Sequence, residues 1–366
     1  MEKPLKNVFI SSIYQNAGKT TLSLGLFKVF TEKGLATAFM KPVGQQTVTV
    51  HDHDIDKDTY LIGEVYRCRR QYKEMSPVTI GPGFTEKYIL DPQHEVLRNR
   101  IEKSFKSLTK NKDAIIIEGT GHAGVGSVID LSNADVAAML GSKVIIVSEG
   151  GIGRSIDEIM LNKALFDLKQ VKILGVIINK VLPDKYERIK KILGKGLESK
   201  GIPVLGLIPL DPILKAPTVE QIMNRLNLKL LTGKSSLNRC VEETIVAAME
   251  PHNMVNYLKD KTLVLTSGDR VDNIMVAVTA HLITPGKRSQ VSGIILTGGL
   301  TPNEKIMELL RKSRIPVLVS NDDTYTLAGK VENLICKIQK SDKNKIAEAL
   351  AVVKEHVDVE RILNNL

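Results

Sequence analysis

The sequence predicts an α/β fold, with a doubly wound, mostly parallel sheet followed by a second, smaller α/β domain. Three observations support this prediction. Short apolar runs alternate with helical patterns from residue 4 to about residue 215, as in parallel sheets covered by helices on both faces. Several of these runs end in polar residues suited to ligand binding, which is typical of the carboxyl edge of such a sheet. A shorter alternation of the same kind fills the rest of the chain.

The individual elements are predicted from apolar runs bounded by glycine, proline and polar residues. A shift in composition near residues 215–240 separates the two domains, and the proline- and glycine-rich residues 71–95 are expected to form an irregular loop. The domains are therefore predicted as residues 1–215, a linker helix and loop over 216–240, and residues 241–366 with a closing helix. The expected strands are residues 8–10, 35–40, 113–118, 143–147, 171–178 and 203–208, then 262–266, 291–296 and 316–320. The expected helices are residues 19–32, 59–66, 97–110, 133–140, 156–168, 186–197 and 219–231, then 272–282, 304–312 and 341–356.

The composition is that of a globular protein with an aliphatic core. Of the 366 residues, 43% are hydrophobic and 25% are charged, and there is no tryptophan. The net charge is +10, but basic residues are mixed with acidic ones and no run pairs them with aromatic residues, so nucleic acid is not an expected partner. The three cysteines lie far apart, which argues against a disulfide framework. We expect a cytoplasmic protein with no membrane partner, because neither a signal-peptide layout nor a membrane-spanning apolar stretch occurs.

The strongest local motif lies between the first predicted strand and the first predicted helix. A Gly-Lys-Thr-Thr run occupies residues 18–21, and the helical pattern continues to Glu32. Gly18 lets backbone N–H groups turn onto a phosphate, where the helix N-terminus adds a positive dipole. Lys19 would reach the β- and γ-phosphates, and the Thr20 hydroxyl would bind Mg²⁺. The predicted phosphate-binding set of this P-loop is Gly18, Lys19, Thr20 and Thr21.

The first half of the P-loop motif is degenerate. The standard pattern has a glycine five residues before Gly18, and this chain has Ile13 there, with Ser12 as the nearest small residue. A tight strand-to-helix turn with a chance Gly-Lys-Thr-Thr run is the alternative interpretation. The flanking strand and helix favour the phosphate-binding loop.

Two further strand ends carry charged residues. Lys41 follows the second predicted strand and precedes Pro42, so we expect it to face a phosphate or carboxylate, with a solvated lysine as the alternative. Glu118 ends the fully apolar third strand, where P-loop enzymes often place an acid beside the metal. The glycine-rich loop that follows contains His122, which either contacts substrate or has no chemical role.

An acidic stretch and one more strand end complete the candidate set of the first domain. Residues 51–58 contain His51 and His53 among acids, which allows a transition-metal site but favours a solvated acidic loop. Asp58, at the start of the next helix, is expected to meet the Mg²⁺ of a bound nucleotide. Asn179 ends another strand at a position that often faces the base in nucleotide folds.

The second domain also has polar residues at its strand ends. Asp269, Arg270, Thr297 and Asn321 could line a site for a small anion or a nucleotide. Turn and cap roles for these residues explain the pattern equally well.

Together, these motifs resemble the dethiobiotin synthetase family, ATP-dependent carboxylating and ring-closing enzymes of biotin synthesis. The matching motifs, in the family's order and spacing, are Gly18-Lys19-Thr20, Lys41-Pro42-Val43, Glu118-Gly119 and Asn179. Asp269-Arg270 and Thr297-Gly298-Gly299 look like a DRTGG-type domain. The two-domain arrangement resembles the N-terminal, non-catalytic region of long phosphate acetyltransferases, and with an end at Leu366 we expect the acetyl-transfer domain to be absent.

The resemblance implies ATP and Mg²⁺ as cofactors and a homodimer. Lys19 and Lys41 would be the catalytic residues, with Lys19 on the phosphates and Lys41 facing the transferred phosphate or the carbamate, while Asn179 would contact adenine. The implied metal-binding residues are Thr20, Asp58 and Glu118. The family's Thr-Glu pair ahead of the Gly-Lys-Thr run is replaced here by Gln15 and Asn16.

The leading hypothesis is a Mg-ATP-binding P-loop protein with a regulatory DRTGG-type domain. Its chemistry would be phosphoryl transfer to a small carboxylate or carbamate. One alternative is a genuine ligase, either dethiobiotin synthetase or an amide-forming relative of the cobyrinate-diamide type. Another is a non-enzymatic regulator of a metabolic enzyme such as phosphate acetyltransferase. The sequence leaves open whether the protein turns over a substrate.

Overall fold

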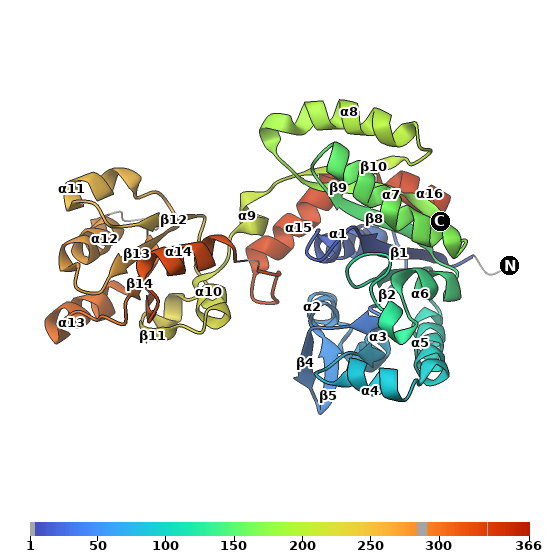
Figure 1. Ribbon diagram of the computed structural model, residues 1–366, viewed down its shortest axis with the longest axis horizontal. Coiled ribbons are helices and arrows are strands. Elements are labelled where there is room, and N and C mark those ends of the chain that lie inside the picture. The colour runs from blue at the N-terminus through green and yellow to red at the C-terminus, as the bar shows by residue number, and fades with distance from the viewer. Residues whose placement is uncertain (1–3, 284–290, 335) are drawn as a thin grey trace. The chain divides into compact units, whose positions relative to one another are not determined.

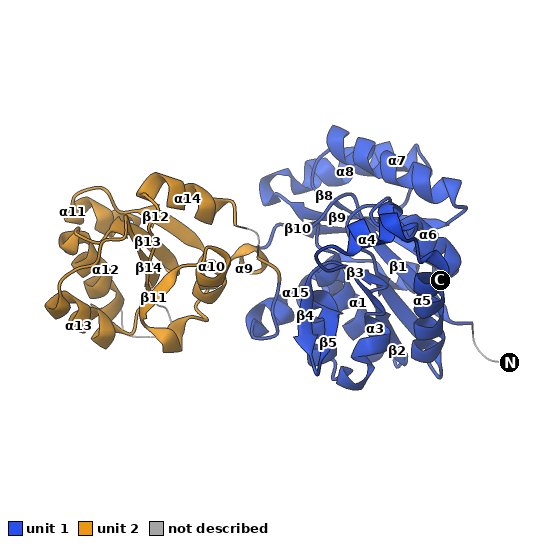
Figure 2. Cartoon of the chain, turned by 60° about the horizontal axis from the view of Figure 1, so that its bottom comes forward, with its two compact units in different colours: residues 1–211, 338–366 blue, residues 212–337 orange. Residues whose placement is uncertain are grey.

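The computed structural model describes residues 4–283, 291–334 and 336–366. The chain forms two compact units (Figure 2), Met1–Asp211 with Ile338–Leu366 and Pro212–Lys337. We refer to them as the first and second unit, and each is described by itself.

The first unit is built on a six-stranded sheet in which every strand is parallel to its neighbours. The order is β10-β9-β8-β1-β7-β2, so the chain starts in the middle and winds outward in both directions. This confirms the predicted doubly wound sheet. The strands are almost fully buried, as their continuous apolar runs require in a parallel sheet. Their bounds are β1 Lys6–Ser12, β2 Thr37–Met40, β7 Ala114–Glu118, β8 Lys143–Glu149, β9 Ile173–Val181 and β10 Val204–Pro209.

Helices cover both faces of this sheet (Figure 1). The helix after the P-loop packs against β1, β7 and the edge strand β2. The predicted helices of the first unit are present, with ends shifted by a few residues. They are α1 Lys19–Glu32, α2 Lys57–Val65, α5 His94–Thr109, α6 Asn133–Met139, α7 Gly153–Leu168 and α8 Tyr186–Glu198.

The acidic stretch at residues 51–58 is more ordered than a solvated loop. It belongs to an antiparallel hairpin of β4 (Thr47–Val50) and β5 (His53–Asp56), whose turn places His51 and Asp52 at positive φ. The side chain of Asp56 then accepts a hydrogen bond from the Asp58 backbone and caps α2. The hairpin thereby turns two acids, Asp56 and Asp58, into the interior.

The expected irregular loop over residues 71–95 is only partly irregular. It contains the short helix α3 (Tyr72–Met75), the two-residue strand β6 (Val78–Thr79), which pairs with β3 (Val43–Gly44), and the helix α4 (Phe84–Leu90). Proline and glycine punctuate these short elements, which explains why the sequence pattern alone suggested a loop.

The C-terminal segment belongs to the first unit, which corrects the prediction that it closes the second domain. Helices α15 (Lys343–His356) and α16 (Val359–Asn365) pack beside β10, and α15 also packs along α1. The contact is close, because a Cβ added at Gly25 of α1 would lie 2.2 Å from the Cβ of Val353. The amphipathic pattern predicted the helix correctly but could not identify the partner that its apolar face covers.

The second unit has a five-stranded sheet of order β11-β15-β14-β13-β12, in which only β11 is antiparallel to its neighbour. Successive side chains of its strands point to opposite faces of the sheet. They form two hydrophobic cores, one under α11–α13 and one under α10 and α14. The strands are β11 Lys229–Thr232, β12 Glu243–Val246, β13 Thr262–Ser267, β14 Val291–Thr297 and β15 Val317–Val319. The helices are α10 Val219–Arg225, α11 Pro251–Met254, α12 Val271–Ile283, α13 Glu304–Ser313 and α14 Thr324–Glu332, and the short α9 Pro212–Lys215 begins the unit.

Part of the predicted linker belongs to this second sheet. The helix expected over residues 219–231 ends at Arg225, and the following residues form β11 instead, paired with β15. The strand β12 and the helix α14 were not predicted either, because each is too short to give a clear periodic signal. The division between the units therefore lies at Asp211 and Pro212 rather than within residues 216–240.

Within the residues that the structure describes, no helix combines the length and the apolar character needed to cross a lipid bilayer.

Replacing Gly25 with alanine tests how α15 packs on α1. We expect Gly25→Ala to lower the free energy of unfolding by about 1–3 kcal/mol, although alanine has the better helix propensity, because the added Cβ meets Val353. Gly194 in α8 is the matched control, since no heavy atom lies within 4 Å of a Cβ added there. Gly194→Ala should raise stability by up to about 1 kcal/mol. Denaturant titrations followed by circular dichroism measure both, and equal upward shifts of the two midpoints would contradict the packing.

Candidate functional site

The carboxyl ends of β1, β7 and β2 bring the predicted P-loop, Glu118 and Lys41 to one edge of the first sheet. In the strand register Ile10 lies opposite Glu118, and Met40 lies opposite Ile117 on the other side of β7. Lys41 directly follows Met40, so the register alone brings it next to Glu118. Parallel strands therefore assemble residues that are 77 positions apart in the chain.

Gly18 occupies a position that only glycine can fill. Its φ of 108° lies in the left-handed region, and it is the residue that caps the N-terminus of α1. An added Cβ would lie 2.0 Å from the Nδ2 atom of Asn179. Asn179 in turn donates a hydrogen bond of 2.8 Å to the carbonyl oxygen of Ala17. The predicted base-facing residue thus also holds the P-loop in place.

Lys19 folds back over the loop that precedes it. Its ammonium donates a 2.8 Å hydrogen bond to the Ser12 hydroxyl, and Ser12 lies within hydrogen-bond distance of the carbonyl oxygens of Tyr14 and Gly121. In the sequence, Ser12 stands out only as the small residue nearest to the missing motif glycine. The structure shows that its hydroxyl links Lys19 to the glycine-rich loop after β7.

Lys41 lies at the centre of a buried cluster of charges. Its ammonium forms ion pairs with Asp58, with Glu118 at 3.3 Å and with Asp56 at 3.4 Å, and all four side chains are almost completely buried. Asp56 was not predicted as a site residue, and the signal that could have found it is its position as the cap of α2. A solvated lysine, the alternative interpretation of Lys41, is wrong.

Glu118 is also bound by the helix that follows the P-loop. The hydroxyl of Thr20 donates to Oε1 of Glu118 at 3.0 Å, and the hydroxyl of Ser23 donates to Oε2 at 2.7 Å. Thr20 and Ser23 are three residues apart and so share one face of α1. That spacing was the available sequence signal for Ser23, which the prediction missed.

The charges of this cluster do not cancel. Three carboxylates, from Asp56, Asp58 and Glu118, surround the single ammonium of Lys41, so the group carries a net charge of about −2 when all are ionised. Burial lowers the pKa of Lys41, but the charges of Asp58, Glu118 and Asp56 outweigh burial, and its pKa lies well above the usual 10.5. The ammonium is therefore protonated throughout the physiological range.

The donor atoms fit a magnesium ion that is shared with a phosphate, but not an all-protein metal cage. Mg²⁺ is usually held by one or two carboxylates together with substrate phosphates and water, all hard oxygen donors. Thr20, Glu118 and Asp58 offer such oxygens at one sheet edge. In residues 4–283, 291–334 and 336–366, no group of three or more His, Cys, Asp or Glu side chains has a metal-holding arrangement. The histidines of residues 51–58 thus form no metal cluster there.

The degenerate half of the P-loop is held by an ion pair. Lys180, which follows Asn179, forms a 2.5 Å ion pair with Glu149 and donates a 2.8 Å hydrogen bond to the Asn16 carbonyl oxygen. Burial and a hydrogen bond to Glu149 raise the pKa of the Tyr14 hydroxyl above its usual range. These contacts hold the segment between the degenerate position Ile13 and Gly18.

Buried polar side chains fix the glycine-rich loop after β7, and Asn133 makes three of these hydrogen bonds. Asn133 accepts a hydrogen bond from the Thr120 backbone at 3.1 Å and donates to the carbonyl oxygens of Thr120 and His122. His122 itself is exposed and accepts a hydrogen bond from the Gly124 backbone.

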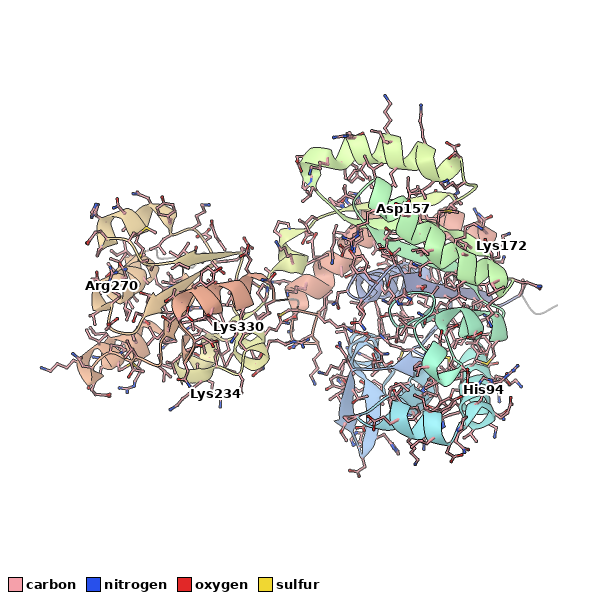
Figure 3. All side chains as sticks on the ribbon, viewed as in Figure 1. His94, Asp157, Lys172, Lys234, Arg270 and Lys330 are labelled. Atoms are coloured by element: carbon pink, nitrogen blue, oxygen red, sulfur yellow. The ribbon has the colours of Figure 1, made fainter. Side chains whose placement is uncertain are left out.

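The strand-end residues of the second unit mostly hold its loops together. Arg270, labelled in Figure 3, donates to the carbonyl oxygens of Ala248 and Met249 and pairs with Asp272. Thr297 lies 2.7 Å from the hydroxyl of Thr324. These contacts favour the turn and cap interpretation for Arg270 and Thr297.

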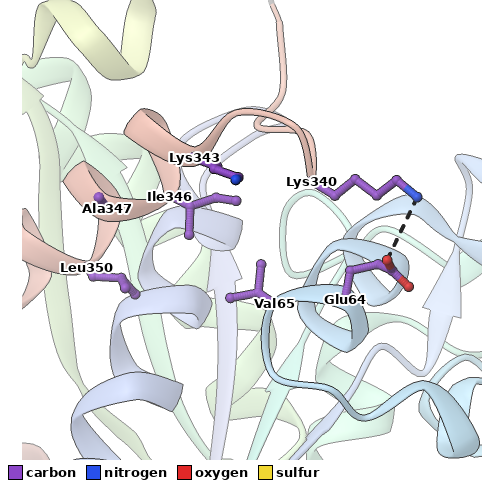
Figure 4. A pocket seen from close by; sticks show the side chains of 7 residues that line it. All are labelled: Glu64, Val65, Lys340, Lys343, Ile346, Ala347 and Leu350. Atoms are coloured by element: carbon purple, nitrogen blue, oxygen red, sulfur yellow. Dashed lines mark ion pairs between the residues drawn. The ribbon is translucent and has the colours of Figure 1, made fainter.

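A separate groove of about 400 Å³ lies in the first unit between α2 and α15 (Figure 4). Its floor is apolar, and the 3.8 Å ion pair of Glu64 with Lys340 lies at its rim. Six residues separate Glu64 from Asp58 in α2, about 9 Å along the helix axis, so the groove is not the charged site. The lining residues are Glu64, Val65, Lys340, Lys343, Ile346, Ala347 and Leu350.

Comparison with known proteins agrees with the two-unit division. Residues 6–218 match the model of the AAA domain family AAA_26, and residues 221–334 match the DRTGG domain model. The chain is 29% identical over 364 residues to the phosphate acetyltransferase of Nitratidesulfovibrio vulgaris, covering 96% of this chain and 50% of that protein. It is 27% identical over 370 residues to the phosphate acetyltransferase of Synechocystis sp., covering 98% of this chain and 52% of that protein.

The chain thus spans about half the length of the curated relatives it matches. The predicted DRTGG domain and the likeness to phosphate acetyltransferases are confirmed. Among solved structures, the septum site-determining protein MinD of Pyrococcus horikoshii OT3 with Mg-ADP is similar at a TM-score of 0.35 and 16% identity, covering 58% of this chain and 84% of that one. That likeness is too distant to support an argument about the site.

Removing the Lys41 ammonium should strongly destabilise the first unit. We expect Lys41→Met to lower the free energy of unfolding by about 3–5 kcal/mol, because it leaves three buried carboxylates without their cation. Because the pKa of Lys41 is raised in the folded state, its contribution to the free energy of unfolding is complete below pH 10.5. That contribution is lost only as the pH rises through the higher folded-state pKa. Denaturant titrations from pH 7 to pH 11 measure this. Lys57→Met, which removes an exposed lysine of α2, is the control, and equal stability of the two variants at pH 7 would refute the cluster's role.

Proposed function

This chain belongs to the AAA_26 family of AAA domains, and from that premise we propose that its first unit binds Mg-ATP or a related nucleotide on the P-loop. In this proposal the DRTGG unit regulates the nucleotide site. The observation that carries the proposal is the meeting of Lys19 and Thr20 with Glu118 and Lys41 at one sheet edge.

The P-loop supplies the phosphate-binding groups. Backbone N–H groups at the N-terminus of α1, including those of Thr20 and Thr21, face the phosphates, and the helix dipole favours the negative charge there. Lys19 exchanges its hydrogen bond with Ser12 for the β- and γ-phosphate oxygens. Gly18 supplies the left-handed φ of this turn, and its missing Cβ leaves the space that the Asn179 side chain occupies.

Thr20, Glu118 and Asp58 are the residues that would hold Mg²⁺. When bound, the ion neutralises phosphate charge and polarises the phosphoryl group. The net negative charge of the Lys41 cluster supports this assignment, because a buried excess of carboxylates favours an added cation. Asn179 is proposed to contact the base from the end of β9.

Lys41 would stabilise a transferred phosphoryl group next to the metal. An ammonium has three donor hydrogens, and three carboxylates already surround this one. Lys41 must therefore lose its ion pair with one carboxylate before it can bind a phosphoryl oxygen. Binding of Asp58 and Glu118 to the metal would free the ammonium for this contact. Transfer to a small carboxylate or a carbamate is the chemistry that this arrangement would serve. A genuine ligase would release ADP only with its carboxylate or diamine substrate.

A second candidate is a regulator that associates with an acetyl-transfer enzyme. It is supported by the matched relatives, which are named phosphate acetyltransferases and are about twice as long as this chain. A cytoplasmic location and a homodimer remain part of both candidates, and light scattering of the purified protein measures the oligomeric state.

Calorimetry with Mg-ATP tests the leading proposal. The wild-type chain should bind, and Lys19→Ala should weaken binding by about tenfold to a hundredfold, since it removes a charged hydrogen-bond donor from the phosphates. Lys28→Ala on the outer face of the same helix is the control and should bind like wild type. Chelation of Mg²⁺ should weaken ATP binding by the wild-type chain more than it weakens ATP binding by the Glu118→Gln variant. No binding at millimolar nucleotide would exclude the proposal.

Mixing the chain with a purified phosphate acetyltransferase tests the second candidate. We expect co-elution in size-exclusion chromatography, or a nucleotide-dependent change in acetyl-transfer rate, if the chain acts as a regulator. Arg270→Ala in the DRTGG unit should alter that effect without changing Mg-ATP binding by the first unit. Separate elution together with an unchanged rate would count against this candidate.

A further inference from the structure

One buried cation of the first unit has no role in the site described above. Lys345, in the first turn of α15, is only 1% exposed, and its ammonium has no hydrogen-bond partner among the described residues. A buried ammonium that lacks a partner is strongly disfavoured, and such groups are normally paired with an anion or an ordered polar group. The location of Lys345 indicates what that partner is.

Lys345 belongs to the row of α15 that faces α1. Lys345, Ala349 and Val353 are spaced four residues apart, so they lie on one face of the helix, and all three are buried. Val353 lies against Gly25 of α1. On α1, Thr21 lies four residues before Gly25 and therefore on the same face.

The two helices run in the same direction. Glu32 is the last residue of α1 and Lys354 lies in the last turn of α15, and their 3.3 Å ion pair brings the C-terminal ends of the two helices together, while Val353 meets Gly25. Lys345 lies eight residues before Val353, about 12 Å along the axis, and Gly18 lies seven residues before Gly25, about 10 Å along the axis. Lys345 is therefore level with the first turn of α1 and the end of the P-loop.

Two residues close to Lys345 in the chain, Lys340 and Glu348, agree with this placement. The Lys340 ammonium, just before the helix, lies 4.8 Å from the ring centre of Tyr60, which is two residues from Asp58 of the charged site. Burial and the charge of Asp211, which follows β10, raise the pKa of Glu348 one turn after Lys345. The Lys340–Tyr60 contact and the influence of the Asp211 charge on Glu348 both indicate that the start of α15 lies near the sheet edge that carries the P-loop.

We propose that Lys345 binds a phosphate oxygen of the nucleotide held at the N-terminus of α1. This proposal rests on the proposed function, because the anion it names is that nucleotide. Lys345 lies outside residues 6–218 and 221–334, so neither family model includes it. The nucleotide site is then completed by a helix that follows the DRTGG unit in the chain, which links the end of that unit covalently to a phosphate contact.

Calorimetry with Mg-ATP on the full chain tests the proposal. Lys345→Met keeps the buried aliphatic chain and removes the charge, and we expect about tenfold to a hundredfold weaker binding. Lys345→Arg keeps the charge and should retain most of the affinity. Lys343→Met, an exposed lysine on the same helix turn, is the matched control and should bind like wild type. The melting temperature without nucleotide should not fall in Lys345→Met, because the fold gives the ammonium no partner.

The outcomes separate the two proposals. If wild type binds Mg-ATP and Lys345→Met binds equally well, the role of Lys345 is refuted and the nucleotide site stands. If Lys345→Met fails to fold or melts markedly lower without nucleotide, Lys345 has a structural role and the proposal is also refuted. If wild type binds no nucleotide, the proposed function itself fails, and the proposal for Lys345 fails with it.

Discussion

The ion pairs of Lys41 are the constraint on which the arrangement of the first unit depends. One ammonium and three carboxylates are buried together, and buried charges are tolerated only when they are paired and hydrogen-bonded. The cluster therefore requires β2 beside β7, the β4–β5 hairpin folded inward and α2 capped by Asp56. The same requirement brings Thr20 of the P-loop helix onto Glu118.

The sequence predicted those parts of the site that depend on strand ends. Parallel strands end at one edge, so Gly18, Lys41, Glu118 and Asn179 could be assigned to a common site without knowledge of any contact. The six strands of the first sheet were also predictable, because buried parallel strands are continuous apolar runs. A glycine before a lysine and a threonine was informative because its left-handed φ excludes other residues.

The remaining features depend on contacts between distant segments, which periodicity does not reveal. In the sequence, Asp56 is one of several acids in a polar stretch. Only the β4–β5 hairpin, which turns its side chain toward Lys41, distinguishes it from the others. The amphipathic face of α15 has many possible partners, and its close packing on α1 needs the small residue Gly25, which leaves room for Val353. Strand β11 follows a helical pattern so closely that it was assigned to the helix, and its pairing with β15 decides its conformation.

The charged sheet edge of the first unit is proposed to be a nucleotide site. A crystal structure with Mg²⁺ and a non-hydrolysable ATP analogue tests it most directly. We expect a triphosphate on the N-terminus of α1, with Lys19 on its β- and γ-phosphates and the metal between Thr20 and Glu118. A saturated crystal with the P-loop empty, or with the nucleotide bound only to the second unit, would contradict it.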